Sequence, residues 1–250
     1  MKVIKLGGSL LDDMTRRVEA LADIATAWAA GEQIVLVHGG GKHIDARLAQ
    51  LGIAKRTHAG LRVTDDATLD VVVSVLGGSV NKMLVAELTA LGVRCAGFSG
   101  ADAATLVAQK HPSIDGVDLG HVGKVVRSSP LLLQSLLGAG ILPVVSSVAQ
   151  GPNGTLLNVN ADTAATAIAE GLGAVSLHFI TDVAGLLDAQ GRVIPKLTAD
   201  EARAFLASDV VTGGMKPKLE AALNALSSGV STIAIGSSRE AEGGTELVAA

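Results

Sequence analysis

Three lysines stand where a positive charge is costly unless an anion lies nearby. Lys5 lies inside the apolar run MKVIKL, which predicts a strand buried on both faces, and Gly7 and Gly8 follow it. Lys216 and Lys218 follow two glycines at the start of a helical pattern, and the dipole of a helix disfavours cations at its N-terminus. An alternative for Lys5 is a strand edge from which its side chain reaches water. For one of the other two lysines, a bound anion is the better explanation.

A carboxylate and two amides lie close together in the segment LLNVNAD. Asn158 and Asn160 alternate onto one side of an extended stretch, and Asp162 falls in the first turn of a helix expected to begin near Ala161. This carboxylate is suited to holding ammonium groups, and the asparagines offer neutral donors and acceptors to a ligand. Helix capping and the helix dipole explain the same residues equally well, so both interpretations stay open.

The glycine run HGGG at 38–41 joins an apolar stretch to a helical pattern. Glycines let several backbone N–H groups converge at the start of a helix, which favours a phosphate or carboxylate. The run matches neither common nucleotide motif, because Ile44 replaces the third glycine of one and His43 follows Lys42 in place of the serine or threonine of the other. A tight turn without a ligand is the alternative. Further along, the segment from Asp182 to Gly185 suits the wall of an adenine or ribose pocket.

Together these residues predict two anionic ligands held by lysines and glycine loops. The sequence offers neither a His–Ser or His–Cys pair nor the spacing of a metal cluster. Such a set suits phosphoryl transfer, in which the protein positions the reactants and neutralises charge on the moving phosphoryl group.

The elements that would position these residues alternate between short β-branched runs and helical patterns, which indicates a mainly parallel sheet covered by helices. Ligands of such sheets bind beyond the carboxyl ends of the strands, where the residues above fall. Val18, Leu21, Ile24, Ala25 and Trp28 predict a buried face on a helix over 14–30. The segment 104–128 suits a β-hairpin that serves as a lid or substrate wall, or as a dimer edge or purely structural hairpin. Strands are predicted near 2–6, 33–38, 93–97, 141–145, 174–181 and 231–235.

Composition sets wider limits. The 250 residues are 48% hydrophobic, enough for a large core, and the single Cys95 excludes an intramolecular disulfide framework. A net charge of -4 and 2% aromatic residues make nucleic acid an improbable partner. Charged residues interrupt the N-terminal apolar stretch early, and no run of about 18 uncharged apolar residues occurs, so we expect a soluble, cytoplasmic protein that binds no membrane.

Several short motifs, in one order along nearly the whole chain, resemble the amino acid kinase family. They are K-x-GG at 5–8, HGGG at 38–41, GLRVTDD at 60–66, LGHVG at 119–123, LPVVSS at 142–147, NVNAD at 158–162, GGMKPK at 213–218 and GGTELV at 243–248. The chain is most similar to members that phosphorylate the side-chain carboxylate of N-acetyl-L-glutamate with ATP in arginine biosynthesis.

The resemblance implies a three-layer αβα sandwich with a mainly parallel central sheet. It implies a single domain over 1–250, in which about 1–173 binds the amino acid and forms the dimer and about 174–250 binds the nucleotide. It further implies a homodimer, and ATP with Mg²⁺ held mainly by the ATP phosphates and no protein metal site. Because the family's arginine-inhibited members carry an extra N-terminal helix, we expect weak or absent inhibition by arginine.

The resemblance also assigns roles to residues. Lys5 and Lys218 would stabilise the transferring phosphoryl group, and Asp162 would orient both lysines. Lys216 stands where the family often has an apolar residue, but the spacing from GGM favours Lys218. The implied substrate-binding residues are Gly40, Gly41, Arg62, Asn158 and Asn160. The implied nucleotide-binding residues are Gly7, Gly8, Asp182, Val183, Ala184, Gly185, Leu186, Leu187, Val210, Val211 and Thr212.

Three other functions are weighed against this one. A related kinase acts on aminoadipate or glutamate attached to an acidic carrier protein, but its docking surface should be basic, whereas this chain is acidic. A non-catalytic amino-acid sensor of the same fold would not need Lys5, Asp162 and Lys218 together. A nicotinamide dehydrogenase would need the dinucleotide fingerprint.

Overall fold

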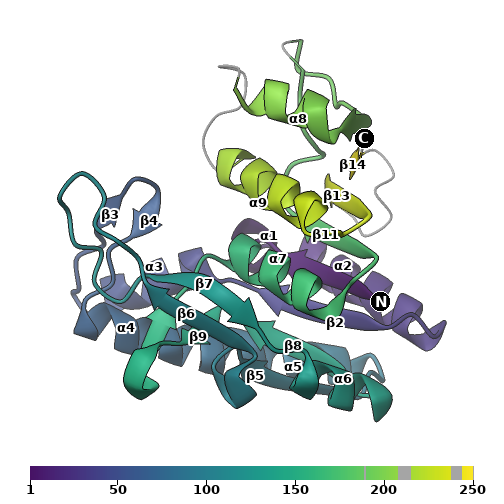
Figure 1. The fold of residues 1–250 in the computed structure, drawn as a ribbon. Helices are drawn as coiled ribbons and strands as arrows, with labels where there is room; N and C mark the ends of the chain where they lie inside the picture. Colours follow the sequence, from purple (N-terminus) through teal and green to yellow (C-terminus); the bar gives the residue numbers. More distant parts are fainter. Residues whose placement is uncertain (189, 208–214, 238–243, 250) are drawn as a thin grey trace.

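The computed structural model describes residues 1–188, 190–207, 215–237 and 244–249. An eight-stranded sheet in the order β12-β14-β13-β11-β1-β2-β8-β5 runs through its centre (Figure 1). All neighbouring strands are parallel except β13 and β14. The strands are β1 (Lys2–Leu6), β2 (Ile34–His38), β5 (Cys95–Ser99), β8 (Leu142–Ser146), β11 (Ser176–Ile180), β12 (Lys196–Thr198), β13 (Thr232–Gly236) and β14 (Thr245–Val248).

Six of these strands, β1, β2, β5, β8, β11 and β13, are the six that the sequence predicts, with small shifts at their ends. Strands β12 and β14 were not predicted. The edge strand β12 contains only three residues, and β14 lies between β12 and β13 as an antiparallel neighbour of β13, a pairing that no apolar run indicates.

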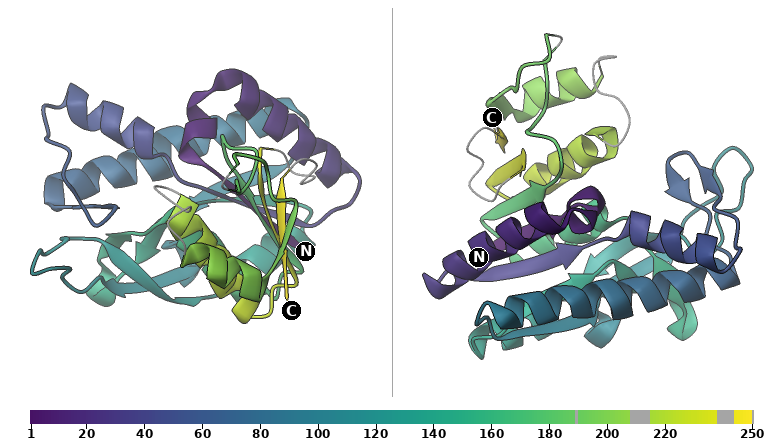
Figure 2. Two further views of the ribbon diagram at one scale, coloured as in Figure 1. Left: turned by 90° about the horizontal axis from the view of Figure 1, so that it is seen from above. Right: turned by 180° about the vertical axis from the view of Figure 1, so that it is seen from behind.

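Helices cover both faces of the sheet, which confirms the predicted three-layer sandwich (Figures 1 and 2). Alternate residues of each strand enter opposite layers: Val3 contributes to the core under α7 and α9, and Ile4 to the core under α2 and α5. One layer contains α1 (Gly8–Asp12), α2 (Met14–Ala29), α3 (Gly41–Gln50), α4 (Asp66–Val73), the π-helix η1 (Ser74–Val80) and α5 (Asn81–Ala90). The other contains α6 (Leu131–Gly138), α7 (Ala161–Leu172), α8 (Ala199–Leu206) and α9 (Met215–Ser227).

Helix α2 confirms the helix predicted over 14–30, but its buried face differs from the expected one. Val18 is 46% exposed, whereas Arg17 is buried and its Nη2 donates to Glu87 Oε1 of α5 at 2.9 Å. The helical spacing therefore placed Val18 on the buried face wrongly. Arg17 occupies that face instead, where it pairs with Glu87. Trp28 is half-buried and contacts both cores, as expected of a packing residue.

A second sheet contains the predicted hairpin. Strands β6 (Leu106–Lys110) and β7 (Gly123–Ser128) pair antiparallel within the segment 104–128, and β9 (Val148–Gln150) and β10 (Leu156–Asn158) extend them to the order β10-β9-β6-β7. The hairpin packs against α7, so it belongs to the layer beside the main sheet. A small hairpin of β3 (Thr57–His58) and β4 (Leu61–Arg62) lies beyond the carboxyl end of the main sheet. The short helices η2 (Asp102–Ala104) and η3 (Pro152–Gly154) complete the described elements.

Helices α4, η1 and α5 run on as one apolar helical stretch, Asp66–Ala90. By length and composition alone this is the one described stretch that could cross a membrane, which is weak evidence because core helices pass the same test. Its buried residues, among them Val72, Leu76 and Leu84, belong to the core under the main sheet. The structure thus gives this stretch a packing role inside the protein.

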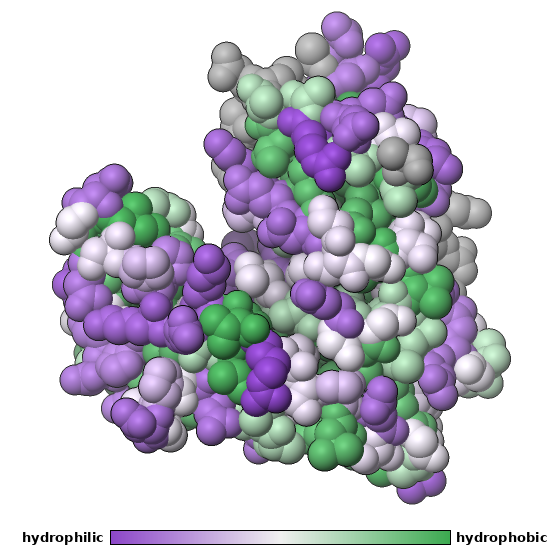
Figure 3. Space-filling view, in the orientation of Figure 1, coloured by the Kyte–Doolittle hydropathy of each residue, from purple (hydrophilic) through white to green (hydrophobic). Residues whose placement is uncertain are grey.

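The N-terminal and C-terminal parts of the chain share the main sheet, since β1 pairs with both β2 and β11. The two parts therefore meet through one continuous sheet. Figure 3 shows the molecule hollowed between the part that carries the β3–β4 hairpin and the upper part that carries α8 and α9. This cleft opens at the carboxyl ends of β1, β2 and β8.

Candidate active site

A buried carboxylate joins two lysines at the centre of the molecule. Asp162 Oδ1 lies 2.8 Å from Lys5 Nζ, and both Asp162 oxygens accept from Lys218 Nζ at 3.2 Å. Lys5 comes from β1, Asp162 from the first turn of α7 and Lys218 from α9, and all three side chains are buried. Lys216 is exposed, which assigns the buried position to Lys218, as the motif spacing indicated.

The charges of this cluster do not balance. Burial alone would raise the pKa of Asp162, but the ammonium groups of Lys5 and Lys218 outweigh it and hold that pKa below its ordinary value. Burial, followed by repulsion from Lys5, lowers the pKa of Lys218 to about 8, although Asp162 opposes the shift. The Phe179 ring, 5.3 Å from Lys218 Nζ, offers its face to the same ammonium. Asp182 also attracts Lys218, so within the buried cluster two cations share Asp162 and a further carboxylate lies nearby.

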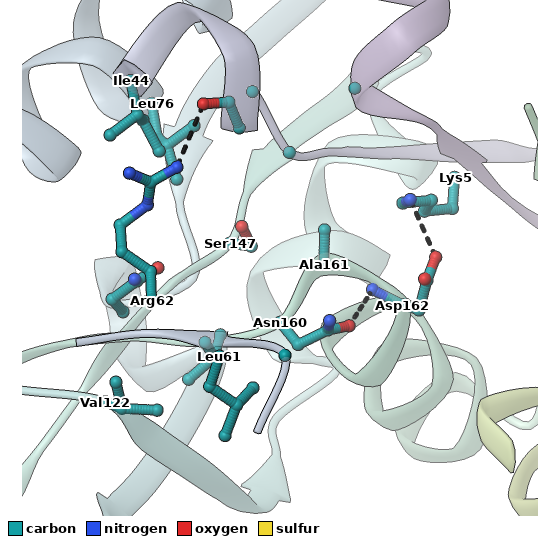
Figure 4. Close-up of a pocket in the computed structure, with 17 residues that line it drawn as sticks. Lys5, Ile44, Leu61, Arg62, Leu76, Val122, Ser147, Asn160, Ala161 and Asp162 are labelled. Atoms are coloured by element: carbon teal, nitrogen blue, oxygen red, sulfur yellow. Dashed lines mark hydrogen bonds and ion pairs between the residues drawn. The ribbon is translucent and has the colours of Figure 1, made fainter. Parts of the chain in front are cut away.

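The capping explanation for this segment also holds. Asn160 Oδ1 accepts from the backbone N–H of Asp162 at 2.8 Å and of Thr163 at 3.2 Å, so Asn160 caps α7. Capping and the charged cluster therefore share this turn: the cap fixes the first turn of α7, and the first turn directs Asp162 to Lys5 (Figure 4).

A cavity of about 300 Å³ lies beside this cluster. Gly40 and Gly41 reach it from the turn between β2 and α3, and Gly8 approaches them so closely that a Cβ there would lie 3.5 Å from Gly41 N. Helix α3 begins without a side-chain cap, so its first N–H groups are free of side-chain acceptors. The residues lining the cavity are Lys5, Gly8, Gly39, Gly40, Gly41, Ile44, Gly60, Leu61, Arg62, Leu76, Val122, Ser147, Asn158, Val159, Asn160, Ala161 and Asp162.

Arg62 enters the cavity from β4 on the side away from Lys5 (Figure 4). Its Nη2 lies 2.5 Å from Asp45 Oδ1 and donates to Gly41 O at 3.1 Å, whereas its Nη1 is buried without a hydrogen-bond partner in the structure. A buried guanidinium nitrogen without an acceptor is costly, so it marks a place for an anionic oxygen. Asn158 also lines the cavity, and its Nδ2 donates to Thr64 Oγ1 at 3.1 Å.

The expected nucleotide residues lie elsewhere. Gly7 packs against β11, where its N–H donates to Ile180 O at 2.8 Å, and only its neighbour Gly8 lines the cavity. After β11, Asp182, Val183, Ala184 and Leu187 are exposed. Gly185 and Leu186 are buried, and the Leu186 N–H donates to Thr245 Oγ1 at 2.8 Å. Val210, Val211 and Thr212 lie outside the described residues.

Sequence reasoning missed several residues around the cavity. Asp45 lies on α3, one helical turn after Gly41, and pairs with Arg62. Its spacing from the glycine run could have marked it as a residue near the cavity. Ser147 lines the cavity and stood inside the quoted LPVVSS motif. No local signal marked Asn81, whose Nδ2 lies 3.0 Å from Nε2 of His38, the residue before the glycine turn. Across the described part of the chain, no three His, Cys, Asp or Glu side chains form a group suited to a metal ion.

Comparisons with known proteins agree with this geometry. Residues 1–237 match the model of the amino acid kinase family. The chain is 44% identical to the acetylglutamate kinase of Solibacter usitatus over 93% of its length and 89% of that protein, and 45% identical to that of Methanopyrus kandleri over 92% of each.

Solved structures give the same result. The protein smu.665 from Streptococcus mutans superposes with a TM-score of 0.87 at 30% identity, covering 99% of this chain and 98% of that one. The N-acetylglutamate synthase of Neisseria gonorrhoeae, solved with coenzyme A and N-acetylglutamate, gives a TM-score of 0.85 at 25% identity, with 99% of this chain and 59% of that one covered. By its motifs, its sandwich and these matches, the chain belongs to the amino acid kinase family.

Proposed function

We propose that this protein phosphorylates the side-chain carboxylate of N-acetyl-L-glutamate with ATP, a step of arginine biosynthesis. The observation that carries the proposal is the buried Lys5–Asp162–Lys218 cluster, whose excess positive charge faces a cavity that also contains an unsatisfied Arg62 nitrogen. The similarity to acetylglutamate kinases over most of the chain supports this substrate.

The chain's own residues divide the work between binding and charge neutralisation. Arg62 Nη1 donates to an oxygen of the amino acid's α-carboxylate, which is its missing acceptor, and the Asn158 amide fixes the same molecule. The side-chain carboxylate then lies near the N–H groups of Gly40 and Gly41 at the start of α3. Lys5 and Lys218 stabilise the charge that spreads over the transferring phosphoryl group, while Asp162 holds both ammonium groups in place.

ATP supplies the phosphoryl group when bound, and Mg²⁺ accompanies its phosphates. Gly8, next to the lysines, lets a phosphate approach the backbone, and the stretch from Asp182 to Leu187 offers an exposed loop for the nucleoside. As the family resemblance implies, Mg²⁺ would be held mainly by ATP oxygens. We assign amino acid binding to about 1–173 and nucleotide binding to about 174–250.

We also propose a cytoplasmic homodimer that arginine inhibits weakly or not at all. Strand β5 (Cys95–Ser99) ends the main sheet, and its half-buried side chains would gain cover from a second copy. Light scattering would test the dimer. Neither the carrier-linked kinase, the sensor nor the dehydrogenase is favoured over the acetylglutamate kinase reaction by the matches.

The decisive test of the substrate is ATP consumption with Mg²⁺ and, separately, N-acetylglutamate, glutamate, aspartate and N-acetylaminoadipate, with hydroxylamine to trap any acyl phosphate. We expect turnover with N-acetylglutamate only. Turnover confined to another acceptor would change the assigned substrate, and no turnover with all four would reject the proposed function.

A further inference from the structure

A buried histidine lies directly behind the glycine turn. His38 ends β2 and has no exposed surface. Its Nδ1 lies 2.9 Å from Gly39 O, and its Nε2 lies 3.0 Å from Asn81 Nδ2. A carbonyl oxygen only accepts, so Nδ1 carries the proton, and the amide nitrogen then donates to the bare Nε2. Both ring nitrogens are thus used, one of them to hold the glycine turn.

Asn81 fixes this tautomer because its own orientation is fixed. Its Nδ2 also donates to Val144 O at 3.0 Å, and its Oδ1 accepts from Lys82 Nζ at 3.0 Å. If the Asn81 side-chain amide were rotated by half a turn, its oxygen would face the Val144 carbonyl and its nitrogen would face the Lys82 ammonium. A protonated His38 would likewise direct Nε2–H at the Asn81 amide hydrogens. Burial, with smaller contributions from Lys82 and His43, lowers the pKa of His38 to about 4.

The turn that His38 holds is also packed from the helical side. Asn81 is the first residue of α5, directly after the π-helix η1, and π-helices are frequent at functional sites. A Cβ at Gly40 would lie 2.9 Å from Leu76 Cδ2 and 3.3 Å from Val80 Cγ2, both in η1. Leu76 lines the cavity itself. One helical stretch therefore contacts Gly40 directly and Gly39 through Asn81 and His38.

We propose that His38, held as the neutral Nδ1–H tautomer by Asn81, is a positioning residue for the amino acid substrate. It anchors the Gly39 carbonyl, so that the N–H groups that open α3 stay directed to the substrate carboxylate. The inference rests on the proposed function, because it concerns the loop assigned to that carboxylate. His38 itself does not line the cavity, and it acts through the glycine turn.

Two substitutions separate anchoring from packing. His38→Asn keeps a donor close to the position of Nδ1, whereas His38→Leu removes both ring nitrogens and keeps an apolar volume. We expect the KM for N-acetylglutamate to rise about tenfold in His38→Leu, the effect of one lost hydrogen bond, and about threefold or less in His38→Asn. The KM for ATP should stay within about twofold in both, a split that general destabilisation does not produce.

Ser146→Ala is the matched control. Ser146 is the register partner of His38 on β8, is equally buried, and has an Oγ without a hydrogen-bond partner in the structure. Its kinetics should equal those of the unmodified protein.

The ¹⁵N shifts of the labelled His38 imidazole should report a protonated Nδ1 and a bare Nε2. If they report the opposite tautomer, or if His38→Leu keeps its KM for N-acetylglutamate, the positioning role is wrong while the proposed function stands. If the unmodified protein neither binds nor phosphorylates N-acetylglutamate, the proposed function fails, and the inference with it.

Discussion

At the scale of single residues, the central feature is a carboxylate shared by two ammonium groups. Asp162 pairs with both Lys5 and Lys218, and the more exposed Asp182 also attracts Lys218. Two buried ammonium groups that share one buried carboxylate suit the approach of an anion, as the proposed phosphoryl transfer requires. By contrast, Arg62 already has Asp45 as a partner and lacks only an acceptor for Nη1.

The charge of Lys218 makes activity depend on pH. Burial and Lys5 lower its pKa to about 8, and the protonated form is the one that stabilises a phosphoryl group. Since kcat/KM reports the free enzyme, it should fall as the pH rises through about 8. In Lys218→Arg, whose side chain keeps its proton, that decline should disappear even though the rate is lower. A decline at the same pH in the arginine variant would contradict the assignment to Lys218.

Arg62 predicts a separate effect on substrate binding. Arg62→Ala should raise the KM for N-acetylglutamate about 10- to 100-fold, as expected for lost charge-assisted hydrogen bonds, and should leave the KM for ATP unchanged. Arg56→Ala is the control, because Arg56 is exposed, pairs with Asp65 and does not line the cavity. Steady-state kinetics with each substrate varied in turn would show the effect. Equal KM values for the two variants would remove Arg62 from the substrate site.

The sequence predicted this chemistry better than it predicted the contacts. A lysine inside an apolar strand requires an anion, and the structure supplies Asp162. The partner itself could not be read locally, because Asp162 lies even farther along the chain from Lys5 than the 56 residues that separate it from Lys218, and capping explained it equally well. Asn160 shows the same ambiguity, since it both caps α7 and lines the cavity.

At the scale of elements, the turn between β2 and α3 depends on close packing against η1. Gly40→Ala should push Leu76 and Val80 aside, because its Cβ would lie 2.9 Å from Leu76 Cδ2. We expect the KM for N-acetylglutamate to rise about tenfold. Gly138→Ala, at the end of α6, is the control, because a Cβ there meets no atom within 4 Å. Similar kinetics for the two variants would show that packing behind the turn does not shape the site.

Periodicity found the buried strands and missed the elements that depend on neighbours. The six predicted strands are apolar runs, whereas β12 has three residues, begins with the exposed Lys196 and buries only Leu197. The π-helix has no sequence pattern of its own. The buried side of α2 was misread at Val18, because the Arg17–Glu87 ion pair involves a second helix that periodicity does not include.

At the scale of the whole molecule, one sheet connects the two sides of the cleft. Strand β1 pairs with β2 on one side and β11 on the other, and Asp162 links α7 to α9 through Lys218.

The same buried interior should make stability depend on pH. The pKa of His38 falls from 6.5 to about 4 on folding, so between these values the unfolded chain binds a proton that the folded chain does not.

The stability that depends on neutral His38 is therefore complete above pH 6.5 and is lost as the pH falls toward 4. The free energy of unfolding in urea should drop by about 1 kcal/mol through His38 alone between pH 7 and pH 5.5. His38→Asn cannot titrate there, and its pH dependence should be shallower by that amount. Identical pH dependences would mean that folding does not lower the pKa of His38.

The measurement that tests the account most directly is kcat for Lys5→Ala, Lys218→Ala and Lys216→Ala with N-acetylglutamate and ATP. Each of the first two variants leaves Asp162 with one lysine partner, so both should fold, which circular dichroism would verify. We predict a loss of about 10²- to 10³-fold in kcat for Lys5→Ala and Lys218→Ala, and an unchanged kcat for the exposed Lys216→Ala. A folded Lys5→Ala or Lys218→Ala variant with an unchanged kcat would contradict the central claim that these buried cations stabilise the transferring phosphoryl group.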